Sequence, residues 1–96
     1  MSAREKFMKQ IRWWPHARER LIERGIDVKL VQAALEHPDQ VVISTGGRKI
    51  IHKRYREGHS HKEYLLRIFA EEHQVEWIIR TVYRTSKISK YWRDEL

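Results

Sequence analysis

Apolar positions recur at helical spacing in the first half of the chain. HARERLIER follows Pro15, which suits the first turn of a helix, and precedes Gly25, which suits the position just past a helix end, so we predict a helix over 16–24. Asp27 suits the cap of a second helix through VKLVQAALEH, residues 28–37, whose apolar residues recur on one side. The pattern therefore predicts two short helices in succession.

The segment before these helices, residues 1–14, is less regular. Charged residues are mixed with Phe7, Met8 and Ile11 across residues 2–13. We predict an N-terminal arm with a helical conformation, and an edge strand is the alternative.

In the second half of the chain, apolar and polar residues alternate, as they do along β-strands. VVIST and RKIIHKRY flank Gly46 and Gly47, and paired glycines supply the positive φ of a tight two-residue turn, which predicts a hairpin. KEYLLRIFA and QVEWIIRTVY predict two more strands, joined by a short turn at Glu72 and His73. Short connections imply antiparallel pairing. We predict an α+β domain in which two N-terminal helices pack on a four-stranded antiparallel sheet, followed by a short C-terminal helix or tail.

Length and composition narrow the class of protein. A chain of 96 residues suits a single domain over 1–96. The absence of cysteine excludes disulfides, thiolate metal sites and a cysteine nucleophile. We find no apolar run that could span a bilayer and no apolar segment of a secretory signal after Met1, so we predict a cytoplasmic protein without a membrane partner.

Charge is the strongest compositional signal. Lys and Arg number 20 against 13 Asp and Glu, which gives a formal net charge of +7. A positive field of this size on a small domain favours nucleic acid, an anionic membrane surface or an acidic protein. A solvated basic surface without a ligand remains the alternative.

The first predicted helix carries a stripe of basic residues. His16, Arg20 and Arg24 recur every fourth residue and therefore share one flank. An imidazole at a helix N-terminus, where backbone N–H groups favour anions, suits proton transfer beside a phosphate. The alternative is a solvated face whose cations pair with Glu19 and Glu23.

Two arginines fall on the last two predicted strands. With a two-residue turn, Arg67 lies opposite Ile78 and becomes a diagonal neighbour of Arg80. Two adjacent guanidiniums need a negative partner, which is either Glu63 or Glu76, or an RNA phosphate.

The remaining candidate groups are histidines and aromatic residues. His59 and His61 could form a metal pair, but no acidic or sulfur ligands lie at a useful spacing, so we predict no metal and no cofactor. We expect most of the histidines His52, His59 and His61 to be surface residues. Tyr91 and Trp92 can either stack on nucleobases or pack the tail onto the sheet.

Three segments of the chain carry a family resemblance: HARERLIERGID, VQAALEHPDQVV and TVYRTSKISKYW. Together they resemble the domain of unknown function 4258 family, over roughly residues 15–92. Its members are similar in layout to the RelE and BrnT toxins. The resemblance implies a RelE-like domain that acts as a metal-independent endoribonuclease on mRNA, often at the ribosome, and is silenced by an acidic antitoxin protein.

The resemblance also implies site residues. Arg80 and Lys87 match the basic positions at the end of the RelE-like sheet, and Tyr91 matches the C-terminal tyrosine. His16 belongs to the narrower family's opening motif. Ser86 stands where RelE-like proteins have an arginine, with Arg84 and Lys87 on either side.

These observations predict a toxin-like endoribonuclease of a toxin-antitoxin system, in which the ribose 2′-OH attacks the adjacent phosphate. The predicted catalytic residues are His16, Arg80, Lys87 and Tyr91, and the predicted RNA-binding residues are Arg20, Arg24, Arg67, Arg84, Ser86 and Trp92. The alternatives are a non-catalytic RNA- or DNA-binding module and a protein-interaction module. The sequence leaves a homodimer open.

Overall fold

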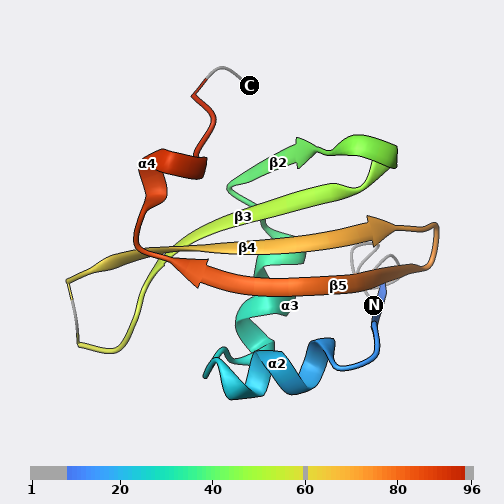
Figure 1. Ribbon diagram of the computed structural model, residues 1–96, viewed down its shortest axis with the longest axis horizontal. Coiled ribbons are helices and arrows are strands. Elements are labelled where there is room, and N and C mark those ends of the chain that lie inside the picture. Colours follow the sequence, from blue (N-terminus) through green and yellow to red (C-terminus); the bar gives the residue numbers. More distant parts are fainter. Residues whose placement is uncertain (1–8, 60, 95–96) are drawn as a thin grey trace, which may run out of the picture.

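The computed structural model describes residues 9–59 and 61–94, which form one mixed five-stranded sheet with two of the helices, α2 (Ala17–Glu23) and α3 (Val28–Glu36), on one face (Figure 1). The strands are β1 (Gln10–Trp13), β2 (Gln40–Ile43), β3 (Lys49–Arg56), β4 (Glu63–Glu72) and β5 (Glu76–Thr85). The short helix α4 (Ile88–Tyr91) follows β5, and a 3-10 turn lies at Thr45–Gly47. The strand order is β1-β5-β4-β3-β2. Among the described residues, no helix is long and apolar enough to cross a membrane.

The prediction of a four-stranded antiparallel sheet is wrong, because part of the predicted helical arm forms a fifth strand. β1 pairs with β5 in parallel, with Ile11 beside Trp77. The Trp14 amide extends the pairing by donating to the Ile79 carbonyl at 2.9 Å. Apolar Ile11 and Trp13 alternate with polar neighbours, and that period of two suits a strand at a sheet edge better than a helix. Residues 1–8 of the predicted arm lie outside the described residues.

Both predicted helices form within a residue of their expected bounds. Asp27 caps α3 by accepting from the Lys29 amide at 2.8 Å. Gly25 ends the α2 turn with a φ of 69°, a conformation that costs glycine little. α2 and α3 lie on the same side of the sheet, whereas α4 follows the end of β5 (Figure 1).

The core lies between these two helices and the sheet. It is formed by apolar residues that are almost completely buried: Leu21, Val31, Ala34, Ile51, Leu66, Ile68 and Ile79. Burial of a large aliphatic side chain contributes roughly 1.5–3 kcal/mol, so this layer accounts for much of the stability. The other side of the sheet carries side chains of alternate positions, including Arg67, Phe69 and Tyr83. We call it the open face.

A bulge in β5 changes which side chains reach the open face. Thr81 pairs with Phe69 and Ile79 pairs with Ala70, so Arg80 is an extra residue without a partner on β4. Arg67 consequently pairs with Tyr83, and the predicted pairing of Arg67 with Ile78 is wrong. The prediction assumed a shorter turn and regular alternation, and a bulge shifts the register by a full residue.

Candidate functional site

Arg67 is the centre of a polar and aromatic cluster on the open face. Its Nε donates to His52 Nε2 at 3.1 Å, and its Nη1 donates to the Tyr83 hydroxyl. Its guanidinium carbon lies 4.1 Å from the ring centroid of Tyr91 and 5.1 Å from that of Phe69. We call these five residues the Arg67 cluster. Three strands and α4 supply its members, so no local stretch of sequence contains it.

Arg67 differs from Arg54 and Arg84 of the same sheet in its partners. Arg54 pairs with Glu63, and Arg84 pairs with Glu57. Within the part of the chain that the structure describes, no carboxylate forms an ion pair with Arg67, and its neighbours are neutral acceptors and aromatic faces. Such a guanidinium keeps its full capacity to attract an anion, and its planar fork suits a phosphate.

His52 lies beside Arg67 on the neighbouring strand β3 and accepts its hydrogen bond. The His52 side chain is buried, with 1% of the residue's surface exposed. An arginine Nε–H can only donate, so His52 Nε2 accepts and the proton of the neutral imidazole is on Nδ1. That Nδ1 lies 2.9 Å from Gln40 Oε1 and donates to it. Burial, reinforced by the charges of Arg67 and Arg93, lowers the pKa of His52 to about 4, so the imidazole is neutral at physiological pH.

The C-terminal segment closes one side of the cluster. Trp92 stacks on His52, with ring centroids 6.3 Å apart, and Arg54 lies 5.0 Å from the Trp92 centroid. The Arg93 amide donates to Gln40 Oε1 at 3.1 Å, which fixes the segment to β2. Trp92 therefore packs the tail onto the sheet, as one of the two sequence interpretations proposed.

Tyr91 is partly exposed, as Trp92 is, and lies against Tyr83 and Arg67. Its ring meets the Tyr83 ring edge-on at 6.4 Å. Partial burial favours the neutral phenol, but Lys90, a hydrogen bond from Tyr83 and the charge of Arg67 together lower the pKa of Tyr91. A lowered pKa increases the phenolate fraction and makes this hydroxyl a better proton acceptor.

A family model described as a domain of unknown function, DUF4258, matches residues 13–84. The chain belongs to this family. No curated protein and no solved structure matches it. The matched residues include Arg67, His52 and Tyr83 but end before α4, so Lys87 and Tyr91 of this DUF4258 protein lie outside the family match.

The structure brings together some of the residues predicted from the sequence. Arg67 and Tyr91 are in contact, and Trp92 stacks on His52, which is bonded to Arg67. Arg80 lies elsewhere on the open face, where it pairs with Glu71 at 2.7 Å. Because Glu71 is four positions from Arg67 on β4, about 13 Å along the strand, the predicted side-by-side arginines do not occur.

The predicted residues of the first helix do not join the Arg67 cluster. His16 Nδ1 lies 3.1 Å from Glu19 Oε2 of its own helix, in line with the solvated-face interpretation. Arg24 Nη1 donates to the Val82 carbonyl at 2.6 Å and so ties α2 to β5. Arg20 is exposed on the same helix.

The strand-to-tail junction carries the other predicted residues. Ser86 and Lys87 are exposed, and the Lys87 amide donates to Thr85 Oγ1 at 3.0 Å just before α4. Arg84 points away from the cluster, because the β5 bulge places it on the side of Tyr64, 5.7 Å from that ring centroid. Lys87 is therefore exposed at the junction, and Arg84 does not reach the Arg67 cluster.

Sequence reasoning missed His52, Gln40 and Tyr83. His52 follows Ile50 and Ile51 within a strand, and a polar residue inside an apolar strand is the one signal that could have indicated a buried hydrogen-bonded group. Its partners come from β2 and β4, and the sequence contains no pattern that joins them.

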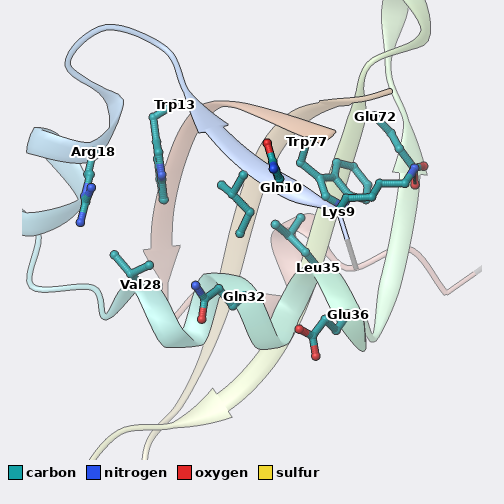
Figure 2. A pocket seen from close by; sticks show the side chains of 11 residues that line it. Lys9, Gln10, Trp13, Arg18, Val28, Gln32, Leu35, Glu36, Glu72 and Trp77 are labelled. Carbon is teal, nitrogen blue, oxygen red and sulfur yellow. Dashed lines mark hydrogen bonds and ion pairs between the residues drawn. The ribbon is translucent and has the colours of Figure 1, made fainter. Parts of the chain in front are cut away.

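A cavity of about 690 Å³ lies on the opposite side of the sheet, between β1, β5 and α3 (Figure 2). Trp13, Trp77 and Leu35 form its apolar walls. Of the two carboxylates that line it, Glu72 is already held by Lys9 at 2.6 Å and by Lys49. The cavity contains none of the residues predicted to carry chemistry, so we assign the functional site to the open face instead.

Proposed function

We propose that this DUF4258 protein binds RNA on the open face of its sheet and cleaves it without a metal, as a toxin-like endoribonuclease related to the RelE and BrnT toxins. The observation that carries the proposal is the Arg67 guanidinium, which has no carboxylate partner among residues 9–59 and 61–94 and is surrounded by aromatic rings. An RNA phosphate supplies the missing anion, and the rings offer stacking surfaces to bases.

The charges around the cluster support the same substrate. Lys87, Lys90 and Arg93 are exposed at the edge formed by the tail, and the chain as a whole has a net charge of +7. Cations arranged around an anion site attract a polyanion and accelerate its encounter with the protein.

The cleavage step needs a proton acceptor and a stabiliser of negative charge. Tyr91, in its phenolate form, takes the proton of the ribose 2′-OH while that oxygen attacks the adjacent phosphorus. Arg67 and Lys90 stabilise the charge that develops on the phosphoryl oxygens. The bond to the 5′-oxygen breaks, water protonates that oxygen, and the products are a 2′,3′-cyclic phosphate and a free 5′-hydroxyl.

The proposed cellular partners are mRNA, on or off the ribosome, and an acidic antitoxin protein. An acidic inhibitor can cover the same cationic surface that attracts RNA, which would couple inhibition directly to substrate exclusion.

The test is incubation of the purified protein with mRNA in EDTA, with and without ribosomes. We expect cleavage by the wild type and a loss of ~10² to 10³ in rate for Arg67→Gln, which removes one charge-stabilising donor. Arg18→Gln is the matched control, because it removes the same charge from an exposed residue beside the cavity on the other face.

Each outcome selects one function. Intact RNA in both conditions would eliminate the enzyme, and salt-dependent binding without cleavage would then select a binding module. Equal effects of the two substitutions would show that RNA does not bind at Arg67. Tight binding to an acidic protein without affinity for RNA would select the interaction module.

A further inference from the structure

A second arginine–aromatic pair lies at the other end of the open face. The guanidinium carbon of Arg80 lies 3.3 Å from the ring centroid of Trp14, which is the closest cation–π contact among the described residues. Glu71 holds the same guanidinium at 2.7 Å, and the Trp14 backbone is fixed to β5 by its amide. The pair is therefore rigidly positioned.

Trp14 is nevertheless accessible to solvent. Its exposed fraction is 42%, although Arg80 covers one side of the ring. Arg80, by contrast, exposes only 19% of its side chain. A tryptophan that packed only for stability would be covered more completely, whereas a ring fixed from one side with much of its surface free can accept a second flat group.

The β5 bulge explains why this pair shares a face with the Arg67 cluster. With Arg80 as the extra residue, Arg80 and Tyr83 both lie on the open face, three positions apart and on the order of 10 Å along the strand. Phe69 and Thr81 form the pair between them. A nucleic acid strand that follows β5 would pass from Arg67 to Trp14 without leaving the face.

We propose that Trp14 is a stacking platform for an RNA base, fixed in place by Arg80 and located on the same face as the phosphate site at Arg67. This inference rests on the proposed function and adds a subsite to it. Base stacking on an aromatic side chain tolerates any base, so the platform adds affinity and sets the direction of the strand rather than its sequence.

The test measures binding of uncleavable RNA by fluorescence anisotropy at one fixed salt concentration. The probes are labelled 2′-O-methyl diadenylate, which is long enough only for the Arg67 cluster, and 2′-O-methyl hexaadenylate, which also reaches Trp14. We expect Trp14→Ala to weaken hexaadenylate binding by about 5- to 150-fold, the range for one stacked base, and to leave diadenylate binding unchanged.

Two controls separate the subsite from the fold and from the proposed function. Trp14→Phe keeps an aromatic ring and should retain most of the hexaadenylate affinity, and Val75→Ala alters another exposed apolar residue without effect. Hexaadenylate binding that depends on Arg67 but not on Trp14 would overturn the platform and leave the proposed function standing. Equal losses for both probes in Trp14→Ala would also overturn the platform. No wild-type binding of either probe would overturn both proposals.

Discussion

Acidification should destabilise this protein through one buried side chain, His52. The imidazole accepts a hydrogen bond from Arg67 and donates one to Gln40, so the fold requires the neutral form. Protonation would place a second positive charge against Arg67 in a site with 1% exposure. His52→Gln preserves an acceptor for Arg67 and a donor for Gln40 but cannot take up a proton.

The magnitude follows from the pKa of His52, which folding lowers from 6.5 to about 4. Between these values the unfolded chain binds the proton and the folded chain does not, so the free energy of unfolding falls as the pH falls. The contribution is complete above pH 6.5. It decreases by about 2 kcal/mol at about pH 5 and by about 3 kcal/mol below pH 4.

The assay is urea unfolding, followed by tryptophan fluorescence, at about pH 7.5, 6 and 5. The wild type should lose about 2 kcal/mol more than His52→Gln between the first and last conditions. A hydrogen bond from Arg80 lowers the pKa of Glu71, and one from Lys49 lowers the pKa of Glu72. These two carboxylates therefore lose their contributions to stability below this pH window, and they do so equally in both proteins. Equal losses in both proteins, or a His52 ring that titrates near 6.5 by NMR, would refute the reasoning.

Three further substitutions test the packing around the site. Arg24→Ala should lower the free energy of unfolding by about 1.5–3 kcal/mol, because it removes a charged donor to a β5 carbonyl. The control Arg20→Ala, at an exposed position of the same helix, should change this free energy by less than about 0.5 kcal/mol. Equal effects of the two substitutions would contradict the anchoring role of Arg24. Gly47→Ala should cost about 1 kcal/mol in urea unfolding, since Gly47 has a φ of 78°, and an unchanged midpoint would argue against that turn. Trp92→Ala uncovers His52 and should raise its pKa from about 4 towards 6.5 in an NMR titration; a midpoint that stays near 4 would show that the tail does not bury it.

The local elements were predictable from the sequence because their signals are local. Gly25 and Asp27 mark the end of α2 and the start of α3 through backbone conformation and a side-chain cap, and both act within a few residues. The hairpin glycines have the positive φ that their pairing predicted, although the turn is a 3-10 turn at Thr45–Gly47 rather than a two-residue turn.

β1 was not predictable in the same way. Four residues contain too few periods to distinguish a strand from a helix, and this strand forms only because β5, more than sixty residues later, offers a parallel edge. The candidate site depends even more on distant partners. His52, Arg67, Tyr83 and Tyr91 were visible as residue types, but strand register decides which of them meet, and the bulge at Arg80 shifts that register.

By itself the sequence determined the two helices, most of the strands, the basic character and the absence of thiol chemistry, because propensity, capping and charge are properties of neighbouring residues. Only the tertiary structure decided that Arg67 would meet a buried histidine and two tyrosines, that Arg80 would lie on Trp14, and that the first helix would keep its histidine outside this cluster. Those outcomes depend on pairing between strands far apart in the chain, where one extra residue in β5 moves every later side chain to the opposite face.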